Sequence, residues 1–89
     1  MTKVRILIVE DEMITAMHER EILESSGYEV TGIVASGEEA IKHAEIERPD
    51  LVLMDITLEG EMDGVQAAWK IWDDYDIPVV FVTAHGDKA

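Results

Sequence analysis

Three nearly continuous apolar runs most strongly constrain the fold of this 89-residue chain. They are VRILIV at Val4–Val9, LVLM at Leu51–Met54 and IPVVFV at Ile77–Val82. None of them alternates strictly between apolar and polar residues, which is typical of strands covered on both faces, as in a parallel sheet. A shorter and weaker strand is predicted at Tyr28–Val34, where Gly32 interrupts the pattern.

Three helical patterns lie between these strands. The first, Glu12–Ser26, ends at Gly27 and carries a broad apolar stripe of Met13, Ile14, Ala16, Met17, Ile22 and Leu23. The second opens at Ser36 with the capping box SGEE and closes before Pro49. We expect His18 and His43, which fall within these two helices, to lie on the surface.

The third helix is predicted over Gly64–Tyr75. Its apolar face is Val65, Ala68, Trp69 and Trp72, at the helical spacing i, i+3, i+4 and i+7. We expect the two tryptophans to serve core or interface packing rather than ligand binding.

The resulting order is βαβαβαβ, which predicts an α/β protein with a parallel sheet, helices on both faces and right-handed crossovers. In such sheets the working site lies at the carboxyl ends of the strands. Asp55 directly follows the buried run Leu51–Met54, so we expect it at that edge of the sheet.

Composition excludes several classes of function. The chain has no cysteine, so disulfides and thiolate metal sites are ruled out. Seven basic and twenty acidic residues give a net charge of −13, which argues against direct binding of nucleic acid. No run approaches the ~18 apolar residues of a membrane span. We expect a soluble cytoplasmic protein that does not bind membranes.

The acidic residues at the strand ends form a chemically coherent set. Glu10 and Asp11 follow the first strand, Asp55 follows the third, and Thr83 follows the fourth. Carboxylates gathered this closely repel one another unless a cation joins them, and Mg²⁺ prefers such oxygen ligands. An aspartate can attack phosphorus, and a nearby hydroxyl can bond a phosphoryl oxygen. The set therefore suits phosphoryl transfer.

These residues resemble the receiver domain of two-component response regulators. The resemblance rests on VEDE near the start, MDITLEGEMDG in the middle and VTAHGD later, and it covers the whole chain. The spacing also agrees, with 44 positions from Asp11 to Asp55 and 28 from Asp55 to Thr83. The resemblance implies a flavodoxin-like doubly wound sheet with strand order 2-1-3-4-5.

The resemblance also implies roles for individual residues. Asp55 would accept a phosphoryl group from a sensor histidine kinase or a phosphotransfer protein. Asp11 would bind Mg²⁺ directly and Glu10 largely through water, and the backbone carbonyl of Thr57 would complete the protein ligands. Thr83 would be the switch hydroxyl. The domain would be a phosphoacceptor switch rather than an enzyme, apart from self-catalysed phosphotransfer and autodephosphorylation.

The chain departs from the family pattern in two places. Glu59 stands where the loop after the phosphoacceptor usually carries proline. The chain also ends at Ala89, so we expect residues 1–89 to form a receiver domain that is incomplete at its C-terminus, without the last strand, its lysine and the last helix. The fourth strand and the Met-rich stripe of the first helix would then be partly uncovered, which predicts a homodimer through either surface.

Two other functions compete with the switch. The first is a phosphohydrolase with an aspartyl nucleophile, but such enzymes generally need a second acid two residues later, where this chain has Thr57. The second is a shortened, unphosphorylated receiver-like module that works by association. The missing lysine favours that module, whereas the intact acids count against it.

Overall fold

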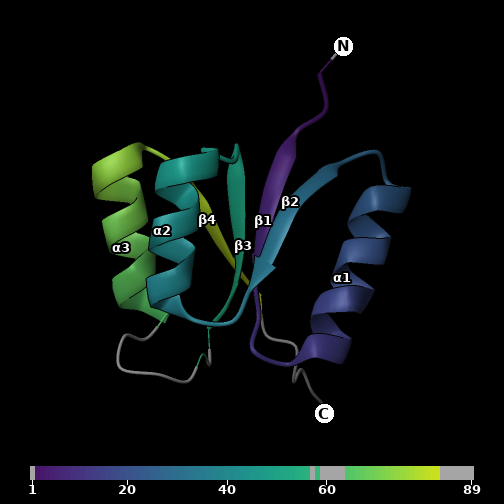
Figure 1. The fold of residues 1–89 in the computed structure, drawn as a ribbon, viewed down its shortest axis with the longest axis horizontal. Coiled ribbons are helices and arrows are strands. Elements are labelled where there is room, and N and C mark those ends of the chain that lie inside the picture. The colour runs from purple at the N-terminus through teal and green to yellow at the C-terminus, as the bar shows by residue number, and fades with distance from the viewer. Residues whose placement is uncertain (1, 57, 59–63, 83–89) are drawn as a thin grey trace.

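The computed structural model describes residues 2–56, 58 and 64–82. Four strands form one parallel sheet in the order β2-β1-β3-β4 (Figure 1). The strands are β1 Arg5–Val9, β2 Glu29–Val34, β3 Leu51–Asp55 and β4 Val79–Val82, and the helices are α1 Met13–Ser25, α2 Gly37–Glu47 and α3 Gly64–Tyr75. The predicted flavodoxin-like order βαβαβαβ is confirmed for the described part of the chain, and strand bounds agree to within two residues.

The helices cover both faces of the sheet. Helix α1 lies on one side, and α2 and α3 lie side by side on the other (Figure 1). Leu7 and Val9 belong to the core beneath α2 and α3, while the alternate residues of β1, Ile6 and Ile8, are buried as well. Strand β1 is therefore covered on both faces, as its uninterrupted apolar run predicts.

The start of α2 and the end of α1 lie where the sequence predicts them. The Ser36 side chain accepts a hydrogen bond from Glu39 N–H at 3.2 Å, and Glu39 Oε1 in turn accepts one from Ala35 N–H at 3.0 Å. This is the predicted capping box, with its return bond made one residue earlier than usual. Gly27 follows α1 with φ +96°, a conformation that glycine adopts without steric cost.

The predicted packing face of α3 is confirmed only in part, because Ala68 packs against the core but the two tryptophans do not. The helix buries Gly64, Ala67 and Ile71, whereas Trp69 and Trp72 are 66% and 50% exposed. Small residues face the sheet because α3 approaches it closely: a Cβ atom at Gly64 would lie 3.1 Å from the carbonyl oxygen of Asp55. The tryptophans instead line an open groove of about 400 Å³ beside β4, together with Val65, Ala68, Pro78, Val79 and Phe81.

The apolar stripe of α1 is mostly uncovered. Ala16 is fully buried and Leu23 is half-buried, but Met13, Ile14, Met17 and Ile22 are each more than half exposed. No helix in the described ranges is long and apolar enough to cross a membrane.

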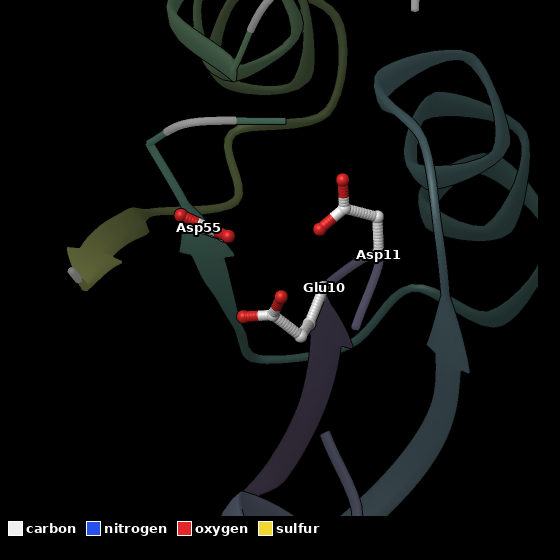
Figure 2. Close-up of side chains that lie close together, drawn as sticks. All are labelled: Glu10, Asp11 and Asp55. Carbon is white, nitrogen blue, oxygen red and sulfur yellow. The ribbon is translucent and has the colours of Figure 1, made fainter. Parts of the chain in front are cut away.

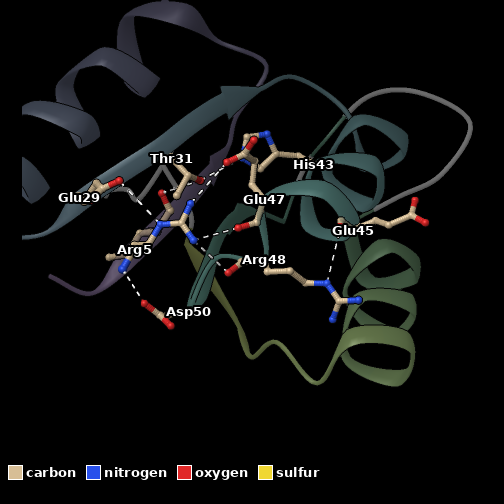
Figure 3. A network of polar contacts seen from close by, with 9 residues as sticks. Arg5, Glu29, Thr31, His43, Glu45, Glu47, Arg48 and Asp50 are labelled. Carbon is tan, nitrogen blue, oxygen red and sulfur yellow. Dashed lines mark hydrogen bonds and ion pairs between the residues drawn. The ribbon is translucent and has the colours of Figure 1, made fainter. Parts of the chain in front are cut away.

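Arg5 ties the amino end of β1 to the end of α2 (Figure 3). Its guanidinium donates to the carbonyl oxygen of Glu47 at 2.9 Å and forms ion pairs with the carboxylates of Glu47 and Glu29 at 3.4 and 3.7 Å. Its backbone N–H donates to Asp50 Oδ2 at 2.8 Å. The last carbonyls of a helix lack partners within the helix, and Arg5 supplies one here.

The two histidines within the helices, His18 and His43, differ in environment. His18 is exposed on α1, as expected, but the prediction for His43 is wrong because its ring is half-buried against β2. His43 Nε2 lies 3.0 Å from Thr31 Oγ1 (Figure 3). The ring can approach the strand here because the neighbouring position, Gly32, has no side chain.

Candidate functional site

Three carboxylates meet at the carboxyl ends of β1 and β3 (Figure 2). Glu10 and Asp11 directly follow β1, and Asp55 is the last residue of β3, the adjacent strand. One carboxylate oxygen from each residue lies within 4.8 Å of those of the other two. Among the described residues, this is the group whose geometry could hold a metal ion.

Burial divides the three acids. Asp55 has no exposed surface and Glu10 is 3% exposed, whereas Asp11 is open to solvent. Burying a carboxylate is costly unless it is hydrogen-bonded or paired with a cation. The site therefore consists of two acids that are withdrawn from water and one at the entrance.

Backbone groups hold Glu10 in place. Its N–H donates to the carbonyl oxygen of Val34 at the end of β2, at 2.9 Å. Its Oε2 accepts from the N–H of Glu12 at 3.0 Å, which turns the carboxylate inward. Its Oε1 is buried and accepts no hydrogen bond in the described part of the chain. A buried oxygen in this state is well suited to a cation.

The electrostatics of the cluster favour a proton on Glu10. The pKa of the Glu10 carboxyl is raised to about 7, chiefly by burial. The hydrogen bond from Glu12 N–H lowers this pKa, whereas the negative charge of Asp55 adds to the rise. Burial, followed by the charge of Asp55, also raises the pKa of Glu19 on α1. Without a cation, the cluster thus carries less negative charge at neutral pH than its three acids would suggest.

The end of β4 lies beside Asp55. Asp55 is in register with Val82, and Ile56 N–H donates to the carbonyl oxygen of Val82 at 3.3 Å. Thr83 follows Val82 in the sequence but, like Thr57, lies outside the described residues. The described residues thus bring together three of the predicted site residues, Glu10, Asp11 and Asp55.

Sequence reasoning missed the role of Gly64. Helix α3 begins against the backbone of Asp55, and a Cβ atom at Gly64 would lie 3.1 Å from the carbonyl oxygen of Asp55 and 3.4 Å from Met54 Sδ. The available signal was Gly64 itself, because glycine permits a close approach of two backbone segments.

Comparison with known families assigns the chain to a family. The family model of the response regulator receiver domain matches residues 6–89. The chain belongs to the response regulator receiver family. It is 36% identical over 86 residues to the chemotaxis protein CheY of Thermotoga maritima, covering 96% of this chain and 71% of that protein.

Other relatives of this receiver domain are longer proteins. The transcriptional regulatory protein PdtaR of Mycobacterium tuberculosis is 39% identical over 84 residues, which cover 94% of this chain but only 40% of PdtaR. The receiver domain therefore spans less than half of that relative, and the match does not extend to the rest of it.

Solved structures of receiver domains have the same fold. The signal receiver domain of a modulated diguanylate cyclase from Desulfovibrio desulfuricans G20 superposes with a TM-score of 0.86 at 42% identity, covering 93% of this chain and 66% of that one. The response regulator PhyR from Brucella abortus gives a TM-score of 0.85 at 40% identity, covering 94% of this chain and 35% of PhyR. These identities support the family as well as the fold.

Proposed function

We propose that this receiver domain is the phosphoacceptor of a two-component system, with Asp55 taking a phosphoryl group from a histidine kinase or a phosphotransfer protein. One observation carries the proposal: carboxylate oxygens of Glu10, Asp11 and Asp55 lie within 4.8 Å of one another at the carboxyl ends of β1 and β3. Open α/β sheets bind ligands at this edge. The family assignment supports the same reading.

Mg²⁺ fits the residues of this site. The donor set is all oxygen, and Glu10 Oε1 is a buried acceptor with no hydrogen bond within the described ranges. We propose Glu10, Asp11, Asp55 and the backbone carbonyl of Thr57 as the protein ligands. Bound Mg²⁺ would supply positive charge that neutralises the oxygens of the transferring phosphoryl group.

The chain's own part in the transfer is nucleophilic. A carboxylate oxygen of Asp55 attacks phosphorus and forms the new O–P bond, while the P–N bond of the donor phosphohistidine breaks. The electron pair of that bond returns to the imidazole nitrogen, which takes up a proton. The hydroxyl of Thr83 would then bond a phosphoryl oxygen.

A stable phosphoryl mimic tests this function without turnover. Beryllium fluoride added to protein already saturated with Mg²⁺ should shift the backbone amide resonances of Glu10, in the cluster, and of Ile56, next to Asp55. It should leave the resonance of exposed Glu45 unchanged. Asp55→Asn should show no such shifts, because it lacks the carboxylate oxygen that the mimic bonds. Identical shifts in Asp55→Asn and the wild type would refute the assignment of Asp55.

We also propose that two copies of the chain associate through β4. Strand β4 pairs with β3 along one edge, and no described strand lies along its other edge. Val80 and Phe81 are 46% and 38% exposed, and Phe81 also lines the groove of Trp69 and Trp72. A strand edge along which no described strand pairs, next to an apolar groove, is suited to accepting another strand.

The absence of charge from the segment around β4 favours a second copy of β4 as the occupant of this edge. Each chain carries a net charge of −13, so two copies repel over most of their surfaces. The segment Ile77–Val82 has no charged residue and is partly exposed, so it offers an approach with little repulsion.

Sedimentation across a dilution series tests this dimer. The wild type should dissociate on dilution, and Val80→Lys, which places a charge on β4, should be monomeric throughout. Ile14→Lys on α1, where the side chain is 80% exposed, is the matched control and should still dimerise. A wild-type monomer at every concentration, or loss of the dimer only in Ile14→Lys, would contradict association through β4.

A further inference from the structure

The pairing of β1 with β2 contains an irregularity. Ile6 is in register with Val30, but the next residue, Leu7, is in register with Gly32, so Thr31 is an extra residue on β2. Such a bulge increases the local twist and changes the direction of the residues that follow it. The residues that follow it here form the half of β2 that runs toward the acid cluster.

His43 of α2 packs directly on this bulge. Its Nε2 lies 3.0 Å from the hydroxyl of Thr31, which also lies 3.5 Å from the carbonyl oxygen of Ile6 (Figure 3). A hydroxyl has a single proton to donate, so both hydrogen bonds form together only when Nε2–H of His43 donates to Thr31. His43 would then connect α2 to both strands at the bulge.

The glycine beside the bulge is required by this contact. A Cβ atom built at Gly32 would lie 2.7 Å from Cε1 of His43, closer than carbon atoms approach in folded proteins. A side chain at position 32 would therefore force the His43 ring out of its present position. The single glycine within β2 marks the place where the ring enters.

The bulge is connected to the acid cluster through the backbone. Two residues after Gly32, the carbonyl oxygen of Val34 accepts the N–H of Glu10 at 2.9 Å. The register of β2 beyond the bulge therefore determines where the backbone of Glu10 is held. We propose that His43 and Thr31 lock the β2 bulge and are thereby positioning residues for Glu10.

The effect of this lock on metal and phosphoryl binding rests on the proposed function. The positioning of Glu10 by His43 and Thr31 does not. A purely stabilising role would make His43 important for the whole fold equally. A positioning role makes the hydrogen bond between Glu10 and Val34 more sensitive to His43 than the hydrogen bonds elsewhere in the sheet. These two roles can be distinguished by exchange of individual amide hydrogens.

Amide hydrogen exchange in metal-free buffer gives the direct test. The Glu10 N–H reports the proposed lock, and the Val52 N–H, which donates to Pro78 at 3.0 Å between β3 and β4, serves as the internal reference. Thr31→Val and His43→Leu should accelerate exchange at Glu10 several-fold more than at Val52. His43→Gln, which keeps an N–H donor, should restore part of the protection.

A matched control and a double-mutant cycle complete the test. His18→Leu alters an exposed histidine on α1 and should leave both amides unchanged. Gly32→Ala should lower the urea midpoint strongly in the wild type and much less in a His43→Ala background, because the clashing ring is gone. Equal acceleration at Glu10 and Val52 in both Thr31→Val and His43→Leu, or equal midpoint shifts in the two backgrounds, would overturn the inference.

Failure of the inference and failure of the proposed function have different signatures. If the wild type bound neither Mg²⁺ nor the phosphoryl mimic, the function would be wrong, while the exchange rates would still decide whether His43 positions Glu10. If the lock holds and the function is right, His43→Leu should also weaken Mg²⁺ binding several-fold, and His18→Leu should not.

Discussion

Glu10 and Asp55 place two buried carboxylates from adjacent strands within 4.8 Å of each other, at the carboxyl edge of the sheet. Buried like charges at this distance are unfavourable unless one of them is neutralised by a proton or a shared cation. The raised pKa of Glu10 means that a proton can neutralise its carboxylate, and bound Mg²⁺ would be the alternative source of positive charge. The predictions on pH and on Mg²⁺ below follow from these two ways of neutralising the cluster.

The first prediction concerns pH and stability without metal. The pKa of Glu10 rises from 4.5 to about 7 on folding, so the folded state binds this proton more tightly than the unfolded state. The stabilisation that protonated Glu10 contributes is fully present below pH 4.5 and is lost as the pH rises to about 7. At about 1.4 kcal/mol per pKa unit, the loss is on the order of 3 kcal/mol.

Urea unfolding of the wild type and Glu10→Gln at several pH values measures this effect. The variant cannot ionise at position 10, so its advantage over the wild type should grow between pH 4.5 and about 7 and then level off. Comparison with the variant removes the contributions of the other acids. Stability curves that stay parallel through this window would show that Glu10 does not titrate as described.

The second prediction concerns Mg²⁺ and thermal stability. A ligand that binds only the folded state stabilises it by mass action, by about 2.7 kcal/mol at a concentration one hundred times Kd. Mg²⁺ should therefore raise the melting temperature of the wild type, and Asp11→Ala should lose most of that rise. Glu45→Ala, which removes an exposed acid on α2, should keep it. The same rise in both variants would place the Mg²⁺ site elsewhere.

The third prediction concerns Arg5. Replacing Arg5 by Met keeps the aliphatic stem but removes the donor to the Glu47 carbonyl and both ion pairs. Hydrogen bonds from charged groups typically contribute about 1.5–3 kcal/mol, so we expect a loss of about that size in the free energy of unfolding.

Arg20→Met is the matched control for Arg5. Arg20 pairs with Glu24 one turn away on α1, at 3.3 Å, and both side chains are about half exposed. Exposed helix pairs of this kind contribute roughly 0.3–0.5 kcal/mol. Denaturation midpoints measured side by side should separate the two variants clearly, and similar losses would mean that Arg5 acts as an ordinary surface residue.

The sequence predicted the sheet and the acid cluster because both follow from local patterns. Continuous apolar runs identify buried parallel strands, and the rule for the carboxyl ends of such strands brings Glu10, Asp11 and Asp55 to one edge. The capping box at Ser36 is likewise a local pattern, and the structure contains it. These inferences need no knowledge of how the elements are rotated about their axes.

The packing of α3 and His43 could not be predicted in the same way. Periodicity identified an apolar face on α3 but not which part of it would face the sheet, and small Gly64 and Ala67 pack closer than Trp69 can. His43 is half-buried because of the bulge at Thr31, which depends on the pairing of two distant segments. Both features depend on tertiary contacts at positions where a side chain is absent or small.

The central claim is that Asp55 accepts a phosphoryl group, and the intact mass of the protein tests it most directly. The wild type should gain the mass of one phosphoryl group after incubation with a small acyl phosphate and Mg²⁺, and should gain none when Mg²⁺ is removed by a chelator. Glu45→Gln should behave like the wild type, and Asp55→Asn should gain nothing. An unchanged wild-type mass, or a full gain in Asp55→Asn, would contradict the account.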